Sequence, residues 1–241
     1  MTAEKASSDY RAIRGTLAIL AAPILLFVSI LMSSVVAVLF GLKAFDIQAS
    51  IFISAAAEVV SLILVVLLGR LRPLKEFFFL RITKWWHIPF GAFVGLVGYV
   101  FLQLGAKITS QLVGSQVGTS DTSSSLGAIP GIQKVLILFL FVSLLGPILE
   151  ELYFRGFIVS SLQHSKLNKT WFIVLVSAIS FGAMHFQGAS TATDVFVLLW
   201  TAIIGAGFAG LLIWSKSIWT SASAHIAYNL ITAISLLTLA K

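Results

Sequence analysis

Long apolar stretches alternate with short polar segments along the whole chain. Seven of these stretches approach the length of about 20 residues that a helix needs to cross the hydrocarbon core of a membrane. They cover residues 16–40, 48–69, 88–106, 134–162, 170–188, 195–214 and 217–239. The fourth stretch is long enough to be broken or partly re-entrant, so six to eight spans fit the pattern. The sequence therefore predicts an all-α, polytopic transmembrane helical bundle of about seven spans.

The polar segments between these spans differ in charge. Cytoplasmic segments of membrane proteins carry an excess of Lys and Arg. A cytoplasmic N-terminus places most of the basic residues on that side, namely Lys5, Arg11, Arg14, Arg70, Arg72, Lys75, Arg81, Lys84, Lys166, Lys169 and Lys216. The first apolar stretch is too long for the core of a cleavable signal peptide and is interpreted as an ordinary span. We expect a multi-pass protein of the cell membrane with its N-terminus in the cytoplasm.

Composition excludes several other classes of protein. Hydrophobic residues make up 59% of the 241 residues and charged residues only 10%, which is too few to cover the surface of a soluble domain. The chain has no cysteine, which rules out disulfides, thiol nucleophiles and thiolate metal sites. The net charge of +7 is better explained by basic cytoplasmic loops than by nucleic acid, so the expected partner is the lipid bilayer.

A few polar side chains lie inside the predicted spans, where they are costly and usually mark function. They are Glu58, Glu150, Glu151, Arg155, His185, His225 and the amide Asn229. Glu151 and Arg155 are four residues apart and share a helix face, so they could form a structural clamp. Glu150 then remains as the freer base. Glu58 has no partner at matching spacing and is interpreted as structural or cavity-lining.

Chain length predicts that these groups lie at one depth. Glu150 precedes Lys166 by 16 residues and His185 follows it by 19, while His225 and Asn229 follow Lys216 by 9 and 13. At about 1.5 Å per residue, straight helices would bring all four groups into one layer that opens toward the cytoplasm. A single His or Asn inside a span more often joins neighbouring helices, so a purely structural polar network is the alternative.

These polar residues fall into three ordered motifs. The motifs are Glu150-Glu151-x-x-x-Arg155, Phe181-x-x-x-His185 and His225-x-x-x-Asn229. Together, they resemble the motifs of the CAAX-processing and bacteriocin-processing intramembrane endopeptidases, also called the abortive-infection or CAAX-protease self-immunity family. The resemblance covers about residues 130–235. It implies proteolysis inside the membrane, at a site open to the cytoplasm, on a peptide or membrane-associated protein substrate.

The apolar stretches, the charges and the resemblance together suggest how the chain is organised. Residues 1–15 would be a cytoplasmic N-terminal segment, and residues 16–133 an N-terminal transmembrane region without motifs. Within that region, the basic and aromatic segment near 70–87 would lie in the headgroup layer or form a plain charged loop. Residues 134–241 would form the catalytic helical core. Eukaryotic relatives remove three residues from prenylated proteins, whereas many bacterial relatives are linked to bacteriocin maturation or self-immunity.

The residue types point to an activated water as the nucleophile. No Gly-x-Ser-x-Gly or His-Glu-x-x-His pattern occurs. We expect Glu150 to take a proton from a water held between it and His185, and His225 and Asn229 to donate to the oxyanion. Three groups would have supporting roles, namely Glu151, Arg155 and Phe181.

A metal ion is the open alternative. Glu150, His185 and His225 could bind zinc in a set of two His and one Glu. Asn is a poor zinc ligand, which favours the metal-free mechanism.

Two other classes of function remain open. A non-catalytic bacteriocin-immunity or scaffold protein could use the same fold to bind a partner. A transporter could use Glu58, Glu150 and the histidines as a proton or ion relay. No inverted repeat is evident, and the polar groups gather in the C-terminal half, which makes a transporter the weaker alternative.

Overall fold

The computed structural model describes residues 79–117, 131–185 and 191–239, which are helical and contain no strand within these ranges. The first two predicted spans and Glu58 lie outside the described residues, as do residues 118–130. The elements are α4 (His87–Val113), α6 (Gly131–Leu136), η1 (Ile137–Leu145), α7 (Gly146–Glu151), η2 (Leu152–Val159), α8 (Ser160–Gln163), α9 (Thr170–Met184), α10 (Ala192–Ser215) and α11 (Ile218–Leu239).

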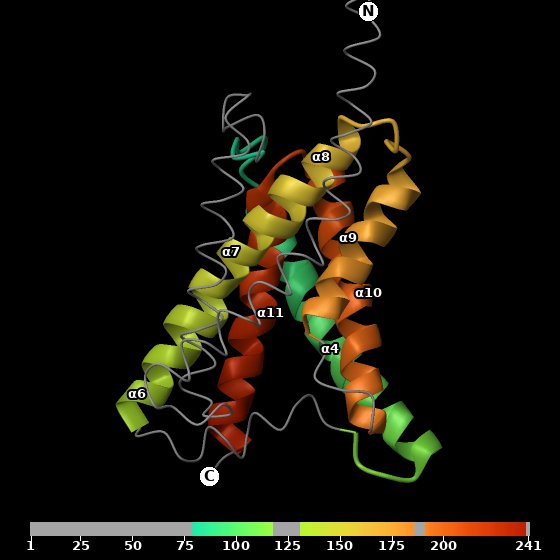
Figure 1. Cartoon of the computed structure of the whole chain (residues 1–241). Helices are drawn as coiled ribbons and strands as arrows, with labels where there is room; N and C mark the ends of the chain where they lie inside the picture. Colours follow the sequence, from blue (N-terminus) through green and yellow to red (C-terminus); the bar gives the residue numbers. More distant parts are fainter. Residues whose placement is uncertain (1–78, 118–130, 186–190, 240–241) are drawn as a thin grey trace, which may run out of the picture.

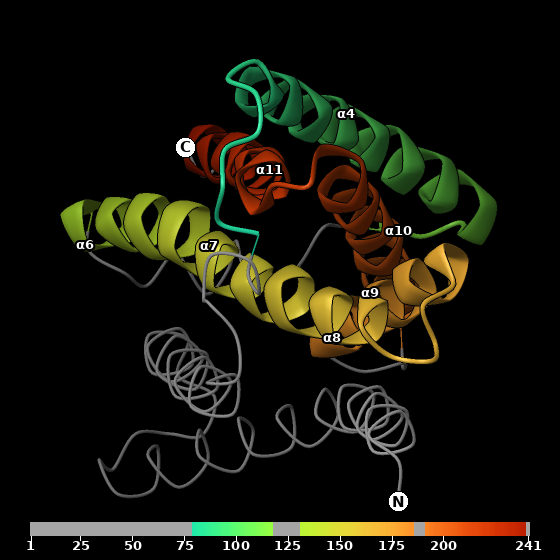
Figure 2. The same cartoon turned by 90° about the horizontal axis from the view of Figure 1, so that it is seen from above.

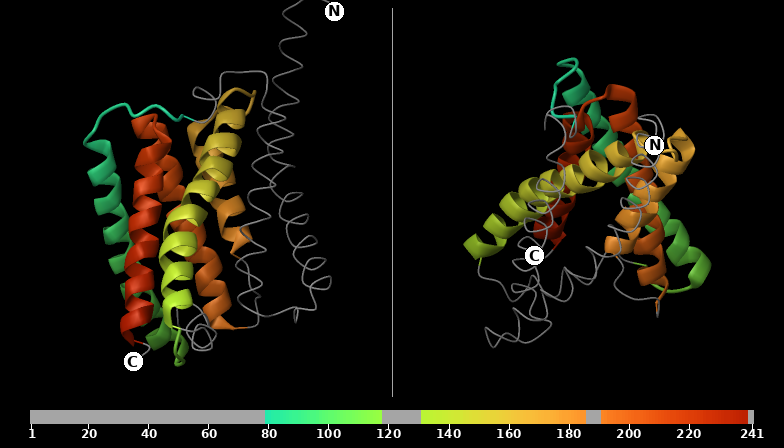
Figure 3. Two further views of the ribbon diagram at one scale, coloured as in Figure 1. Left: turned by 90° about the vertical axis from the view of Figure 1, so that its left-hand side faces the viewer. Right: turned by 45° about the horizontal axis from the view of Figure 1, so that its top comes forward.

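Five of these elements form one uninterrupted helix from Gly131 to Gln163, shown from yellow-green to yellow in Figures 1 and 3. The predicted fourth span is therefore neither broken nor re-entrant. Its two π-helical segments, η1 and η2, flank α7. Pro147 explains the first, because proline has no N–H and its ring clashes with the carbonyl four residues before it. The helix widens just ahead of it, and Gly146 donates to Phe141 O, five residues back.

Within the described ranges, three helices are long and apolar enough to cross a membrane. They are His87–Val113, Lys134–Gln163 and Ala192–Ser215. Thr170–Met184 is apolar but shorter, and α11 carries polar residues that include His225 and Asn229. The all-helical prediction is confirmed for these ranges, while the count of seven spans is not.

The central helix of the described region is α11. It lies between α4 on one side and the long helix on the other, with α10 beside it (Figure 2). Helix α9 packs against α10 and η2. A buried cluster of apolar side chains from η2, α9, α10 and α11 forms the core; it includes Phe154, Ile158, Phe181, Leu212 and Ile218. Because α11 touches helices on both sides, it can bring its polar residues against the glutamates of α7.

The helix α11 approaches α4 closely at two glycines of α4. A Cβ atom added to Gly91 would overlap the carbonyl oxygen of Thr220, and one added to Gly95 would overlap that of Ala224. Ser223 donates a hydrogen bond to Ile88 O at 2.9 Å. This interface therefore depends on backbone-to-backbone contact.

A short segment, residues 79–86, crosses the turn between α10 and α11. Ile218 N donates to Phe79 O at 3.0 Å, Trp219 Nε1 to Leu80 O at 2.8 Å, and Thr83 Oγ1 to Ser215 O at 2.8 Å. It lies at the same end of the bundle as the α8–α9 connection (Figure 1). The predicted segment 70–87 is described only in this part, and its position in a headgroup layer stays a prediction.

Candidate active site

A buried ion pair on the long helix forms the base of the site. Arg155 Nη1 lies 3.1 Å from Glu151 Oε1, and both side chains are fully buried. Arg155 Nη2 also donates to the carbonyl of Gly205 on α10 at 3.1 Å. The four-residue spacing predicts this pair. A buried charge needs such a partner, so each of these residues fixes the other.

His225 of α11 joins this pair to the second glutamate. Its Nδ1 lies 3.2 Å from Glu151 Oε1, and its Nε2 lies 3.7 Å from Glu150 Oε2. The imidazole is itself buried and stacks on Phe208 of α10, with ring centroids 4.8 Å apart. One imidazole therefore faces both glutamates, one at hydrogen-bonding distance and the other just beyond it.

Glu150 is the less constrained of the two glutamates. Its side chain keeps 17% of its surface exposed, whereas that of Glu151 is fully buried. Glu150 Oε2 accepts no hydrogen bond within the part of the chain that the structure describes. Glu150 is thus the carboxylate that combines an unpartnered acceptor atom with access from outside the cluster.

The middle motif meets this cluster through its phenylalanine. Phe181 of α9 has its ring centroid 4.5 Å from the guanidinium carbon of Arg155 and 5.5 Å from the ring of His225. The ring of His185 lies 4.7 Å from that of Phe181. Phe181 therefore contacts both imidazoles and covers the arginine with an aromatic face.

His185 is the residue that caps α9. Its Nδ1 lies 2.9 Å from Phe181 O, a contact in which Nδ1 carries the proton and leaves the lone pair on Nε2. Among the described residues, the structure records no hydrogen bond or ion pair between His185 and either glutamate. The expected water between Glu150 and His185 stays a prediction.

Asn229 lies one helical turn beyond His225 on α11. Its side-chain amide donates to the backbone carbonyl of Val142 in η1 at 2.8 Å. The two predicted α11 residues thus both reach the long helix, His225 at α7 and Asn229 at η1. One N–H of the Asn229 amide remains for another acceptor.

Two residues of the site were not predicted as such. Gly205 supplies the carbonyl for Arg155, and a Cβ atom there would lie 3.0 Å from the Phe181 side chain. Phe208 stacks on His225. Their three-residue spacing puts Gly205 and Phe208 on one face of α10. Neither residue is ionisable, so neither has the feature that marks the other site residues in the sequence.

The described residues do not form a ready metal site. Within them, no three His, Asp or Glu side chains lie close enough together to share a metal ion. Glu151 is already occupied by Arg155 and His225, and His185 contacts Phe181. The zinc set of Glu150, His185 and His225 therefore does not fit the arrangement in this structure.

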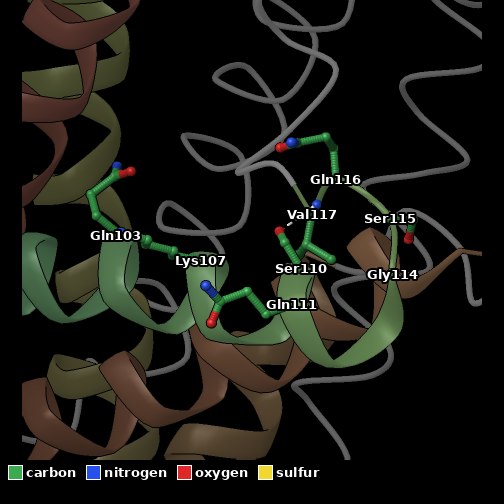
Figure 4. A pocket seen from close by; sticks show the side chains of 8 residues that line it. All are labelled: Gln103, Lys107, Ser110, Gln111, Gly114, Ser115, Gln116 and Val117. Atoms are coloured by element: carbon green, nitrogen blue, oxygen red, sulfur yellow. Dashed lines mark hydrogen bonds between the residues drawn. The ribbon is translucent and has the colours of Figure 1, made fainter.

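A hollow of about 560 Å³ lies elsewhere, at the C-terminal end of α4 (Figure 4). Its lining consists of Gln103, Lys107, Ser110, Gln111, Gly114, Ser115, Gln116 and Val117. Val117 N donates to Ser110 Oγ at its edge. None of the three motifs contributes to it, so it is separate from the polar cluster.

Comparison with known proteins gives a family for the region that carries the site. Residues 132–231 match the sequence model of a family described as "Type II CAAX prenyl endopeptidase Rce1-like". A Bacillus subtilis (strain 168) protein, "Putative membrane peptidase YdiL", is 37% identical over 103 residues, which make up 43% of this chain and 38% of that protein. No solved structure matches the chain. The region with all three motifs, residues 132–231, is therefore similar to the Rce1-like family of type II CAAX prenyl endopeptidases, which confirms the resemblance that the motifs predicted.

Proposed function

We propose that this chain is an intramembrane endopeptidase of the CAAX-protease type, with Glu150 as the general base. The observation that supports it most is the position of Glu150 Oε2, 3.7 Å from His225 Nε2, on a helix apolar enough to cross a membrane. Ionisable groups gathered inside a membrane are retained when they serve a function. A protein or peptide with a prenylated C-terminus is the proposed class of substrate, after the description of the family.

Hydrolysis begins with proton transfer to Glu150. Glu150 takes a proton from water, and the hydroxide oxygen attacks the carbonyl carbon of the scissile peptide bond. The tetrahedral intermediate then collapses, the C–N bond breaks, and the proton on Glu150 passes to the leaving amine. His185, whose Nε2 carries the lone pair, accepts a hydrogen bond from the same water.

His225 stabilises the negative charge that develops on the carbonyl oxygen. Its Nδ1 faces the carboxylate of Glu151, so Nδ1 carries a proton, and Nε2 can donate only when the ring is an imidazolium. As an imidazolium it gives the cluster two positive charges, on Arg155 and His225, against two carboxylates. Its Nε2–H then donates to the oxyanion, with the second N–H of Asn229 as a further donor.

The variant Glu150→Gln tests this mechanism. Gln keeps the size of the side chain but cannot take the proton, so we expect cleavage to fall by at least about 100-fold, the usual contribution of a general base. The assay uses the full-length protein in detergent with a farnesylated fluorogenic peptide that ends in a CAAX sequence. Asp194→Asn, in the capping box of α10, is the matched control and should cleave at the original rate.

Unchanged cleavage by Glu150→Gln would contradict the mechanism. Cleavage that is lost on exhaustive chelation and restored by zinc would instead favour the metal-dependent alternative. The proposed setting is the cell membrane, with several spans and a cytoplasmic N-terminus. The exposed basic residues Arg81, Lys84, Lys166, Lys169 and Lys216, which lie in the segments at one end of the bundle, support that end as the cytoplasmic one.

A further inference from the structure

The backbone carbonyl of Val142 lacks the partner that a helix normally supplies. In the π-helical segment η1 each carbonyl accepts from the residue five positions later, and for Val142 that residue is Pro147, which has no N–H. The residue four positions later, Gly146, donates instead to Phe141 O. Neither the i+5 nor the i+4 backbone N–H therefore donates to the Val142 carbonyl. A buried carbonyl without a hydrogen bond is costly.

Asn229 provides the missing donor from another helix. Its amide nitrogen lies 2.8 Å from Val142 O, which is the length of a good hydrogen bond. Asn229 also follows His225 by four residues, so the two side chains leave α11 on the same face. The side chain that donates to the Val142 carbonyl thus lies one helical turn from the imidazole that faces the glutamates, on the same face of α11.

Three contacts then join the antiparallel α11 and long helix at successive levels. Leu138 packs near Ala233 in a small buried cluster, Val142 accepts from Asn229, and Glu150 faces His225. At the apolar level the two helices can shift along each other at little cost in free energy, because dispersion contacts are not directional. The hydrogen bond from Asn229 is directional and fixes the position of one helix along the other.

We infer that Asn229 is a positioning residue that replaces the N–H missing at Pro147 and so sets the register of Glu150 and Glu151 against His225. In this role Pro147 and Asn229 act together: the proline leaves the Val142 carbonyl without a backbone donor, and the asparagine amide donates a hydrogen bond to it. This inference rests on the proposed function where it concerns catalysis. Reacting groups misplaced by 1 Å can lose a factor of about 100 in rate, so such an anchor matters to the site.

Restoring the backbone N–H tests the inference. Pro147→Ala supplies a donor at the position five residues after Val142, so it should make Asn229 partly dispensable. Asn229→Ala should lower the thermal midpoint of the detergent-solubilised full chain by about 4 °C with Pro147 present, and by less than half of that in the Pro147→Ala background. With the farnesylated CAAX peptide, kcat should fall about tenfold or more in Asn229→Ala and recover at least threefold in the double variant, at unchanged KM.

Ser235 offers a matched control on the same helix. Its hydroxyl accepts a hydrogen bond from Tyr99 of α4 at 2.7 Å, whereas the side chain that donates to Val142 O is that of Asn229, so Ser235→Ala should lower the midpoint equally in both backgrounds. If Asn229→Ala does not fold, Asn229→Leu keeps the volume of the side chain without its donors and replaces it in the cycle.

Two results would overturn the inference. Equal losses of midpoint for Asn229→Ala in both backgrounds would show that the amide does not substitute for the proline N–H. A recovered midpoint without any recovery of kcat would show that the loss of rate comes from the missing oxyanion donor alone and not from the register of the two helices. If the unmodified chain does not cleave the peptide, the proposed function fails, while the thermal cycle still decides whether Asn229 is the anchor of Val142.

Discussion

The two faces of α11 are held in opposite ways. Toward α4, Gly91 and Gly95 allow the helix backbones to approach so closely that a Cβ atom at either glycine would overlap a carbonyl of α11. Toward the long helix, contact is made by His225 against two glutamates and by Asn229 against a carbonyl. One face depends on shape, the other on charge and hydrogen bonds.

The charged face also contains polar atoms whose hydrogen bonding is incomplete. Glu150 Oε2, Glu151 Oε2 and Arg155 Nε have no hydrogen-bond partner among the described residues. Buried polar atoms are usually satisfied, and exceptions call for a reason such as catalysis. The close packing on the α4 face can hold α11 in place while the opposite face leaves Glu150 Oε2 without a hydrogen-bond partner among the described residues, as the proposed function requires.

The largest loss of stability is expected from removing one partner of the buried ion pair. Arg155→Met leaves Glu151 buried without its guanidinium and should destabilise the fold by about 3–5 kcal/mol. Glu151→Leu combined with Arg155→Met removes both charges and should regain most of that loss. Thermal unfolding in detergent measures both variants. A double variant as unstable as Arg155→Met alone would contradict the view that the unpaired charge is the cause.

The sequence predicts whatever depends on spacing within one helix. The lengths of apolar stretches give the positions of α4, α9, α10 and α11 to within a few residues, except for the seven-residue extension of α4 to Val113. The spacing of Glu151 and Arg155 predicts their ion pair. These features follow from the 3.6-residue period of the helix and need no knowledge of how helices pack.

Contacts between helices are harder to predict, because they depend on register and rotation. His225 faces both glutamates, whereas His185 contacts Phe181. This difference follows from how α11 and α9 are rotated about their own axes. The π-helical segments on either side of α7 also shift every side chain after them relative to a regular helix. A proline inside a helix favours an irregularity there, but the partner of the carbonyl that Pro147 leaves without a donor lies 87 residues away at Asn229.

A smaller loss is expected where α11 meets α4. In Gly95→Ala the new methyl group overlaps the carbonyl of Ala224, so the helices must separate, at a cost of about 1–3 kcal/mol. Because α11 also carries His225, cleavage of the farnesylated peptide should fall with the thermal midpoint. Gly210→Ala is the matched control: nothing lies within 4 Å of its Cβ position in the described chain, and it should be neutral or slightly stabilising.

The smallest effect is expected for the hydroxyl on the same α4 face. Ser223 donates to Ile88 O of α4, but its oxygen also lies 2.9 Å from Thr220 O in its own helix. Ser223→Ala removes one shared hydrogen bond and creates no clash, so thermal unfolding should show a loss of about 1 kcal/mol or less. Cleavage should stay at the original rate, because α11 keeps its distance from α4. A loss as large as that of Gly95→Ala would mean that hydrogen bonding, rather than backbone approach, holds this face, and that the two sides of α11 are more alike than their side chains indicate.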